Sequence, residues 1–221
     1  MSAASCRIPF EVAPFRLSGT VYGTLLNHAS ALAALGDKLG APPYNAPPRA
    51  PVLYVKPRNT LSISGDSVEV PLAEEVEVSA CLGIVIGRTA CNVSKEKALE
   101  HVAGFLIVND VSIPHPNYYR PSVRYKARDG FCPLGPRVTA RSLVPDPDAI
   151  TLSTYVDGEL VQTMSTTDLI RSVAQLLADV TDFMTLAPGD VLAAGAAAPA
   201  PRVRAGQTVV IETDEIGRAH V

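Results

Sequence analysis

The chain has 221 residues, of which 47% are hydrophobic and 19% are charged, and its formal net charge is −3. This composition is typical of a globular domain with a full hydrophobic core, and it excludes a disordered chain. A nucleic-acid partner requires a basic stripe that displaces counterions, and the sequence has no run of lysine or arginine. The most apolar stretch, residues 191–200, is too short to cross a bilayer. We therefore expect neither nucleic-acid binding nor a membrane role.

The cysteines and the N-terminal residues indicate the compartment. The cysteines have no C-x-x-C spacing, which favours neither a zinc ribbon nor a disulfide framework and predicts a reducing environment. Prolines and charges interrupt the first residues where the apolar core of a signal peptide would lie, so no signal peptide is expected. We predict a cytoplasmic protein. The cysteines are Cys6, Cys81, Cys91 and Cys132.

The first half of the chain is predicted to contain short strands between turns. Residues 1–17 are expected to form an irregular or strand-like extension, and residues 18–221 a single domain. A proline-dense loop over residues 41–51 precedes a short strand at Val52–Val55, and the next four residues, Lys56 to Asn59, form a polar turn.

Two buried strands are predicted next. In residues 76–87, apolar and polar side chains alternate at first, and the run then becomes continuously apolar. This pattern is typical of a strand that passes from a half-exposed to a buried position. Asn92 or Ser94 is predicted to cap a short helix that ends near Val102. The second strand covers residues 105–108, and Asp110 follows its end.

The clearest local pattern is a hairpin. Residues 151–156 and 159–164 flank Asp157 and Gly158, a pair that favours the positive φ angles of a tight turn. Thr166 or Thr167 is predicted to cap the helix that follows.

The remaining pattern completes the predicted fold class. Apolar residues recur at three- and four-residue steps over residues 169–184, which indicates a helix with one buried face. Strands are predicted at 191–194 and, as the last element, at 208–212. Many short strands joined by turns, with few helices, predict an α+β fold rich in β-structure.

Several segments occur together in the order that one family shares. They make the chain resemble the fumarylacetoacetate hydrolase superfamily from about residue 18 onward, and the resemblance implies a mixed β-roll with a few short helices. Within the superfamily, KPRNT at 56–60 and RDGFCP at 128–133 are most similar to the N-terminal halves of the bifunctional isomerase/decarboxylases of 4-hydroxyphenylacetate (homoprotocatechuate) degradation. The shared segments include LLNH at 25–28, YVKPRNT at 54–60, GIVIG at 83–87, NDV at 109–111, YYRP at 118–121, KARDGFCP at 126–133 and LAPGD at 186–190.

The resemblance implies a Mg²⁺ or Mn²⁺ site. Its ligands would be two glutamates spaced E-x-E on a strand and an aspartate at the end of a neighbouring strand, and the ion would chelate a 2-oxo acid and stabilise its enolate. Aligned on the GIVIG segment, the chain has Ser79 and Cys81 at the glutamate positions and keeps Asp110. A hydroxyl and a thiol are poor ligands for a hard ion. We therefore expect a degenerate site whose metal is weakly bound or absent.

A second acidic pair lies upstream. Glu75 and Glu77 also form an E-x-E pattern, but four residues out of register, which is ~13 Å along an extended strand. A bulge absorbs one residue rather than four. We favour a solvated strand edge for this pair and keep metal ligation as the alternative.

The resemblance also implies substrate contacts. Lys126 corresponds to the family lysine that contacts the oxyanion or carboxylate of the substrate, with a surface lysine as the alternative. Arg120 is placed to bind a second carboxylate bidentately, or else to pair with a structural aspartate. Tyr119, Arg128 and Asp129 complete the expected substrate-binding set, and Asp129 is also a candidate for orienting Lys126 or capping a turn.

Three further positions bear on the site. His28 is the best acid/base candidate, although a lone histidine near an opening strand is more often structural. His115 is interpreted as a surface residue, and Cys81 as a buried strand residue rather than a nucleophile. Gly195 is expected to contact the substrate, but two alanines replace the Thr-Pro that follows it in the family. The lost hydroxyl would weaken anion binding by ~1.5–3 kcal/mol.

These expectations give a first functional hypothesis with two alternatives. The chain would be a decarboxylase or isomerase subunit acting on 5-oxopent-3-ene-1,2,5-tricarboxylate or 2-hydroxyhepta-2,4-dienedioate, which are small di- or tricarboxylic 2-oxo acids or their enols. One alternative is a non-catalytic subunit that supports a metal-competent paralogue, and another is a generic 2-oxo acid hydrolase. A homo-oligomer, or a hetero-oligomer with a paralogous subunit, is expected.

Overall fold

The computed structural model describes residues 11–12, 15–17, 20–42, 45–70, 74–115 and 122–220. The helices are α1 (Ala29–Ala33), α2 (Val123–Lys126) and α3 (Val173–Thr181), with 3-10 helices η1 (Gly36–Gly40), η2 (Arg58–Thr60), η3 (Lys95–His101), η4 (Arg141–Leu143) and η5 (Thr166–Asp168). The strands are β1 (Glu11–Val12), β2 (Phe15–Arg16), β3 (Val21–Leu25), β4 (Val52–Lys56), β5 (Leu61–Ile63), β6 (Val76–Glu77), β7 (Ala80–Ile86), β8 (Val102–Asn109), β9 (Cys132–Leu134), β10 (Thr139–Ala140), β11 (Thr151–Val156), β12 (Glu159–Ser165), β13 (Val191–Ala193), β14 (Arg202–Val203), β15 (Val209–Thr213) and β16 (Gly217–His220).

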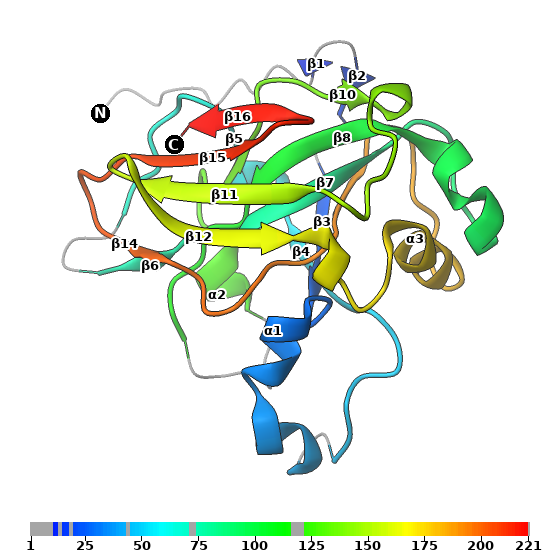
Figure 1. Ribbon diagram of the computed structural model, residues 1–221, viewed down its shortest axis with the longest axis horizontal. Helices are drawn as coiled ribbons and strands as arrows, with labels where there is room; N and C mark the ends of the chain where they lie inside the picture. The colour runs from blue at the N-terminus through cyan, green and yellow to red at the C-terminus, as the bar shows by residue number, and fades with distance from the viewer. Residues whose placement is uncertain are drawn as a thin grey trace.

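Two sheets form the body of the described structure. A mixed eight-stranded sheet has the order β4-β3-β13-β7-β8-β9-β5, with β10 paired to β8. A four-stranded antiparallel sheet, β12-β11-β15-β16, lies in front of it, while α3 lies beside the sheets and α1 extends away from them (Figure 1). The β-rich α+β fold is thus confirmed. None of the helices in the described residues has the length and hydropathy that a membrane crossing requires.

The central strands β7 and β8 are buried on both faces. Every residue of β7 is buried, as expected for a strand covered on both sides. One face packs against the four-stranded sheet, where Leu82 and Phe105 join Leu152 and Ile211 in the larger core cluster. The opposite face of these strands has the smaller apolar cluster. We call this face of the sheet the site face. Its residues include Val21, Cys81, Val85, Leu106, Val108, Cys132, Leu134, Val191 and Ala193.

The predicted hairpin is confirmed. Strands β11 and β12 pair antiparallel, and both turn residues have positive φ, 51° at Asp157 and 86° at Gly158. The Asp157 carboxylate also accepts a hydrogen bond from the Thr208 amide at 2.8 Å, which fixes the turn to the start of β15. Local turn chemistry therefore determines this part of the fold.

The predicted start of the long helix is wrong. The helix α3 begins at Val173, and its cap is Ser172, whose hydroxyl accepts from the Gln175 amide at 3.3 Å. Thr166 is unavailable as a cap because its hydroxyl accepts from the Ile150 amide at 2.8 Å. The next residues are extended, since the Ile170 amide donates to the carbonyl of Asn27. A contact distant in sequence thus removes the first turn of the predicted helix.

Other predicted boundaries also change. The strand predicted over residues 76–87 is divided into β6 and β7, because the Val78 amide donates to Pro201 instead of continuing the ladder. The predicted helix that ends near Val102 is the 3-10 helix η3, and Ser94 occupies its cap position without a side-chain cap bond. Strand 208–212 is not the last element, since β16 follows it. Of the predicted extension, residues 1–10 lie outside the described residues.

Core packing predicts a contrast between two leucines of the hairpin. Leu152 is fully buried between the sheets, whereas Leu160 is 57% exposed. Leu152→Ala should lower the free energy of unfolding by about 2–5 kcal/mol, because it removes buried methyl groups and leaves a cavity. Leu160→Ala, the matched control, should change it by less than about 0.5 kcal/mol. Urea unfolding followed by circular dichroism measures both, and equal losses would contradict the described packing.

Candidate active site

Three neighbouring chain segments place Ser79, Asp110 and Cys132 side by side on the site face. The Asp110 amide donates to the Ser79 carbonyl at 2.9 Å. Val108 pairs with both Cys81 and Leu134, so Asp110, two residues later, lies opposite Cys132 in the antiparallel register. The positions that the resemblance assigns to the two missing glutamates therefore lie beside Asp110.

Asp110 is enclosed by three polar side chains. Its Oδ2 accepts a hydrogen bond from Lys126 Nζ at 2.5 Å and another from the Tyr54 hydroxyl. Its Oδ1 lies 2.8 Å from Lys56 Nζ. The side chains of Lys56 and Asp110 are only 1% and 5% exposed, and that of Lys126 is 12% exposed. Two ammonium groups thus face one carboxylate in a nearly water-free position.

Lys56 connects the segments around the carboxylate. Its ammonium donates to the carbonyls of Val111, Lys126 and Phe131 at 2.6, 2.8 and 2.7 Å. These three bonds account for its three protons, so its contact with Asp110 is an ion pair. The assignment of Lys56 to a polar turn is wrong, because β4 continues through it and pairs it with Val21. The alternation that puts residues 54 and 56 on one face was the available signal.

Tyr54 reaches the carboxylate by lying across a glycine. Tyr54 pairs with Gly23, and a Cβ added at Gly23 would lie 1.9 Å from Cζ of the tyrosine ring. Ala193 is the next residue across the sheet, so no large side chain blocks the ring there. Lys126 Nζ lies 4.6 Å from the ring centroid, which adds a cation–π contact. Glycine at position 23 is therefore a requirement of the site.

The surroundings set the protonation of the cluster. Burial would raise the pKa of Asp110, but the Lys126 and Lys56 ammonium groups outweigh burial and hold this pKa well below its usual range. Burial, and then the Asp110 charge, raise the pKa of Tyr54 well above its ordinary value. Burial likewise raises the pKa of Cys81, and that of Cys132 to about 12. The phenol and the thiols are neutral at pH 7, so the cluster has an excess of one positive charge.

The residues present do not fit a divalent ion. Ser79 and the neutral Cys81 thiol supply no charged oxygen. Asp110 Oδ2 is hydrogen-bonded to Lys126, and Oδ1, which accepts no hydrogen bond, faces the Lys56 ammonium at 2.8 Å. Over the part of the chain that the structure describes, no three His, Cys, Asp or Glu side chains converge as a metal site would require. A divalent ion about 4 Å from either ammonium would be repelled by roughly 8 kcal/mol at an effective dielectric constant of about 20.

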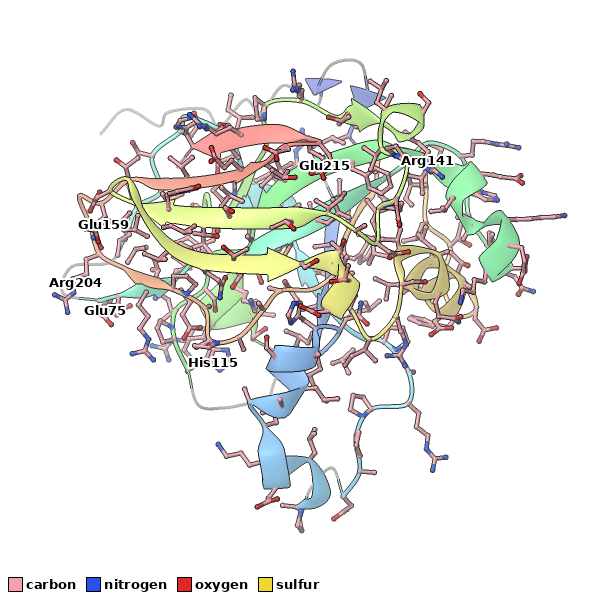
Figure 2. All side chains as sticks on the ribbon, viewed as in Figure 1. Glu75, His115, Arg141, Glu159, Arg204 and Glu215 are labelled. Atoms are coloured by element: carbon pink, nitrogen blue, oxygen red, sulfur yellow. The ribbon has the colours of Figure 1, made fainter. Side chains whose placement is uncertain are left out.

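The upstream acidic pair is bound by arginines. Glu75 lies 2.7 Å from Arg204, and Figure 2 shows these two residues next to each other at one end of the molecule. Arg202 lies 3.7 Å from Glu75 and 3.8 Å from Glu77. Both glutamates are about one-third exposed, in keeping with a solvated edge. The charge of this pair is thus balanced locally by β14 and its neighbour.

Asn27 organises a second group of predicted residues. Its side chain donates to the carbonyl of Ala194 at 2.7 Å and accepts from the Arg171 amide at 2.9 Å. Gly195 has a φ of 127°, and a Cβ there would lie 3.1 Å from the Asn27 Cβ. Asn27 therefore fixes the segment that carries Gly195. Sequence reasoning missed this role because both partners are distant along the chain.

His28 is buried at the start of α1. Its Nδ1 accepts from the Ser30 amide at 3.2 Å, so the ring caps the helix. Burial lowers the pKa of His28, and the Asp168 charge opposes this effect in part. The ring is therefore neutral at pH 7, and its capping contact is the structural role that sequence reasoning weighed against an acid/base role.

The other predicted residues lie around the α2 segment or outside the described residues. Asp129 is exposed and accepts from the Asn59 side chain at 2.7 Å, and Arg128 is half-buried. His115, interpreted as a surface residue from the sequence, is half-buried and stacks on Tyr125 with ring centroids 4.3 Å apart. The loop is held there by a backbone hydrogen bond from Ile113 to Tyr125. Tyr119 and Arg120 lie outside the described residues.

The lowered pKa of Asp110 predicts an acid-dependent loss of stability. Above about pH 5 the carboxylate is charged in both states, and Asp110→Asn should cost about 3–5 kcal/mol because it leaves two buried ammonium groups without a counter-charge. Below about pH 4 the unfolded wild-type chain takes up a proton that the folded state does not. The cost of the substitution should then shrink by about 1.4 kcal/mol per pH unit. Urea unfolding at pH 6, 4 and 3 measures this; an unchanged difference at pH 3 would show that the ion pairs do not form.

Comparison with known proteins supports the resemblance. The family model described as fumarylacetoacetate (FAA) hydrolase C-terminal matches residues 20–221. The 4-hydroxyphenylacetate degradation bifunctional isomerase/decarboxylase of Salmonella dublin is 38% identical over 215 residues, which cover 91% of this chain and 49% of that protein. The chain thus spans about half the length of this curated relative.

Solved structures show the same fold. The 2-hydroxyhepta-2,4-diene-1,7-dioate isomerase of Mycobacterium marinum has a TM-score of 0.78 and 28% identity, with 94% of this chain and 74% of that chain covered. The fumarylpyruvate hydrolase of Pseudomonas aeruginosa, solved in complex with Mn²⁺ and pyruvate, has a TM-score of 0.79 and 26% identity, with 94% and 89% covered. From the family match over nearly the whole chain and the identity to the Salmonella relative, the chain belongs to the fumarylacetoacetate hydrolase family.

Proposed function

We propose that this chain is the counterpart of the N-terminal half of a 4-hydroxyphenylacetate (homoprotocatechuate) isomerase/decarboxylase. It would act in the cytoplasm on 2-hydroxyhepta-2,4-dienedioate or 5-oxopent-3-ene-1,2,5-tricarboxylate. The names of two relatives support this assignment, one an isomerase/decarboxylase and the other an isomerase of the dienedioate. The match covers about half of the Salmonella relative, and a homo-oligomer, or a hetero-oligomer with a paralogous subunit, stays the expected assembly.

The excess positive charge beside Asp110 is the observation that carries the proposal. Both substrates have at least two carboxylates, and both reactions pass through an enolate: one moves a proton between carbons, and the other releases CO₂ and leaves an electron pair on the conjugated system. A buried cation stabilises such an oxyanion more than water does. Lys56 and Lys126 together provide one more charge than Asp110 neutralises.

Lys126 is the group that would contact the substrate oxygen. Its ammonium has three protons, and among the described residues Asp110 is the carboxylate that accepts one of them. Lys56 and Tyr54 hold Asp110, and Asp110 in turn orients Lys126. These three residues are therefore assigned as positioning residues. The assignments of His28, Tyr119, Arg120, Arg128, Asp129 and Gly195 to proton transfer or substrate binding stay predictions.

A supporting subunit is the second candidate, and one observation favours it. Both carboxylate oxygens of Asp110 are engaged within the chain, and the side chain of Lys126 is only 12% exposed. A polar cluster closed in this way leaves little of the Lys126 side chain accessible to a ligand. In this case the chain would bind a metal-competent paralogue and contribute no chemistry.

Turnover by the purified chain distinguishes the two candidates. Each substrate is followed by ultraviolet absorbance with the wild-type chain alone, and then with a paralogous chain that keeps the E-x-E and Asp ligands. The enzyme reading predicts turnover by the chain alone, and Lys126→Met should lower kcat by about 100-fold or more, since it removes an oxyanion donor. Lys97→Met, at an exposed lysine of η3, is the matched control and should leave kcat unchanged.

The remaining outcomes each decide against one candidate. If turnover occurs only when the paralogue is present and Lys126→Met has no effect on it, the chain is a supporting subunit. If the chain neither turns over a substrate nor changes the activity of the paralogue, both candidates are rejected.

A further inference from the structure

The residues at positions 79 and 81 suggest how this chain differs from a relative that holds Mn²⁺ and pyruvate. We propose that, without carboxylates at these two positions, Asp110 pairs with the ammonium groups of Lys56 and Lys126 and not with a divalent ion, so that this chain binds 2-oxo acids without a metal. The inference rests on the proposed function for the class of ligand. The test of this inference measures ligand binding alone, so its outcome is independent of whether the chain turns over a substrate.

Charge conservation is the first support. At the positions that the resemblance assigns to two glutamates, this chain has the neutral side chains of Ser79 and Cys81. Losing two carboxylates removes two negative charges, and losing a divalent ion removes two positive charges. A site that lacks both the two glutamates and the ion therefore has the same net charge as a site that has them. An anionic substrate would experience a similar attraction from the metal-free site.

The contacts of Asp110 are the second support. Oδ2 accepts hydrogen bonds from both Lys126 and Tyr54. Oδ1 accepts no hydrogen bond, but it faces the Lys56 ammonium at 2.8 Å. The lysine at 56 cannot move away easily, because three carbonyls hold its ammonium. An entering ion would meet that fixed positive charge as well as the one on Lys126. The Asp110 carboxylate thus contacts the ammonium groups of two lysines of this chain.

The residues beside Asp110 are the third support. Cys81 and Cys132 flank the Asp110 position on the site face and are fully buried. Neither position has a carboxylate that could pair with the second lysine, so Asp110 alone faces both ammonium groups there. An ammonium donates directed N–H bonds to a keto or carboxylate oxygen and does not chelate, so we expect binding that is weak but insensitive to metal.

Binding of pyruvate and oxalate to the wild-type chain is the direct test. Isothermal titration calorimetry of pyruvate with EDTA and then with excess Mn²⁺ should give dissociation constants that agree within about twofold, whereas oxalate, which itself chelates Mn²⁺, is titrated with EDTA only. Electron paramagnetic resonance of the protein with Mn²⁺, in the absence of oxalate, should show the Mn²⁺ as free. Lys126→Met should weaken oxalate binding by at least about tenfold, the scale of one lost charge-assisted hydrogen bond. Lys97→Met should not. Binding that requires Mn²⁺, or no binding in either condition, would overturn the proposal.

A gain of metal binding tests which residues exclude the ion. Ser79→Glu with Cys81→Glu restores three carboxylates together with Asp110 and keeps both lysines. The double variant should bind Mn²⁺ at least about tenfold more tightly than the wild-type chain, as measured by the loss of the free Mn²⁺ resonance signal. Equal affinities would show that the residues at positions 79 and 81 do not exclude the ion and would refute the proposal. Circular dichroism checks folding, and if the double variant fails to fold, the wild-type titration still decides.

Discussion

The Asp110 carboxylate between two lysine ammonium groups is the interaction on which the site depends. A charge removed from water costs several kcal/mol unless it is paired and hydrogen-bonded. The carboxylate therefore holds the two lysine side chains in place, and the lysines in turn keep the carboxylate charged. Lys56 extends the constraint, because its bonds to three carbonyls hold the end of α2 against the segments after β8 and before β9. The site is therefore part of the sheet framework rather than a loop placed on it.

The sheet supplies the room that this arrangement needs. Gly23 lets the Tyr54 ring lie flat across β3, and the neighbouring residue on β13 is Ala193. The opposite face of the same strands is filled by large apolar side chains that pack against the four-stranded sheet. One face is thus specialised for stability and the other for a polar cluster. A side chain larger than hydrogen at position 23 would act on the site through Tyr54 and leave the main core intact.

Elements governed by local chemistry were predictable from the sequence. The Asp157–Gly158 hairpin and the buried strand β7 follow from turn preferences and from hydrophobic pattern, and the structure has both. The adjacency of Ser79 and Asp110 followed from family motifs. Elements that depend on distant partners were missed: Ser172 replaces Thr166 as a cap because Thr166 is bonded to Ile150, sixteen residues away. A polar residue inside a strand, such as Lys56, gives the same local signal as a turn.

The retention of an excess positive charge is informative about function because stability alone does not explain it. Apolar residues of similar volume often replace a buried ion pair at no cost, and they would leave no unbalanced charge. Here the two neutral thiols and the neutral phenol cannot balance the second ammonium, and the acidic pair at Glu75 and Glu77 is bound to arginines elsewhere. The carboxylate ligand proposed for Lys126 would supply the negative charge that the cluster lacks.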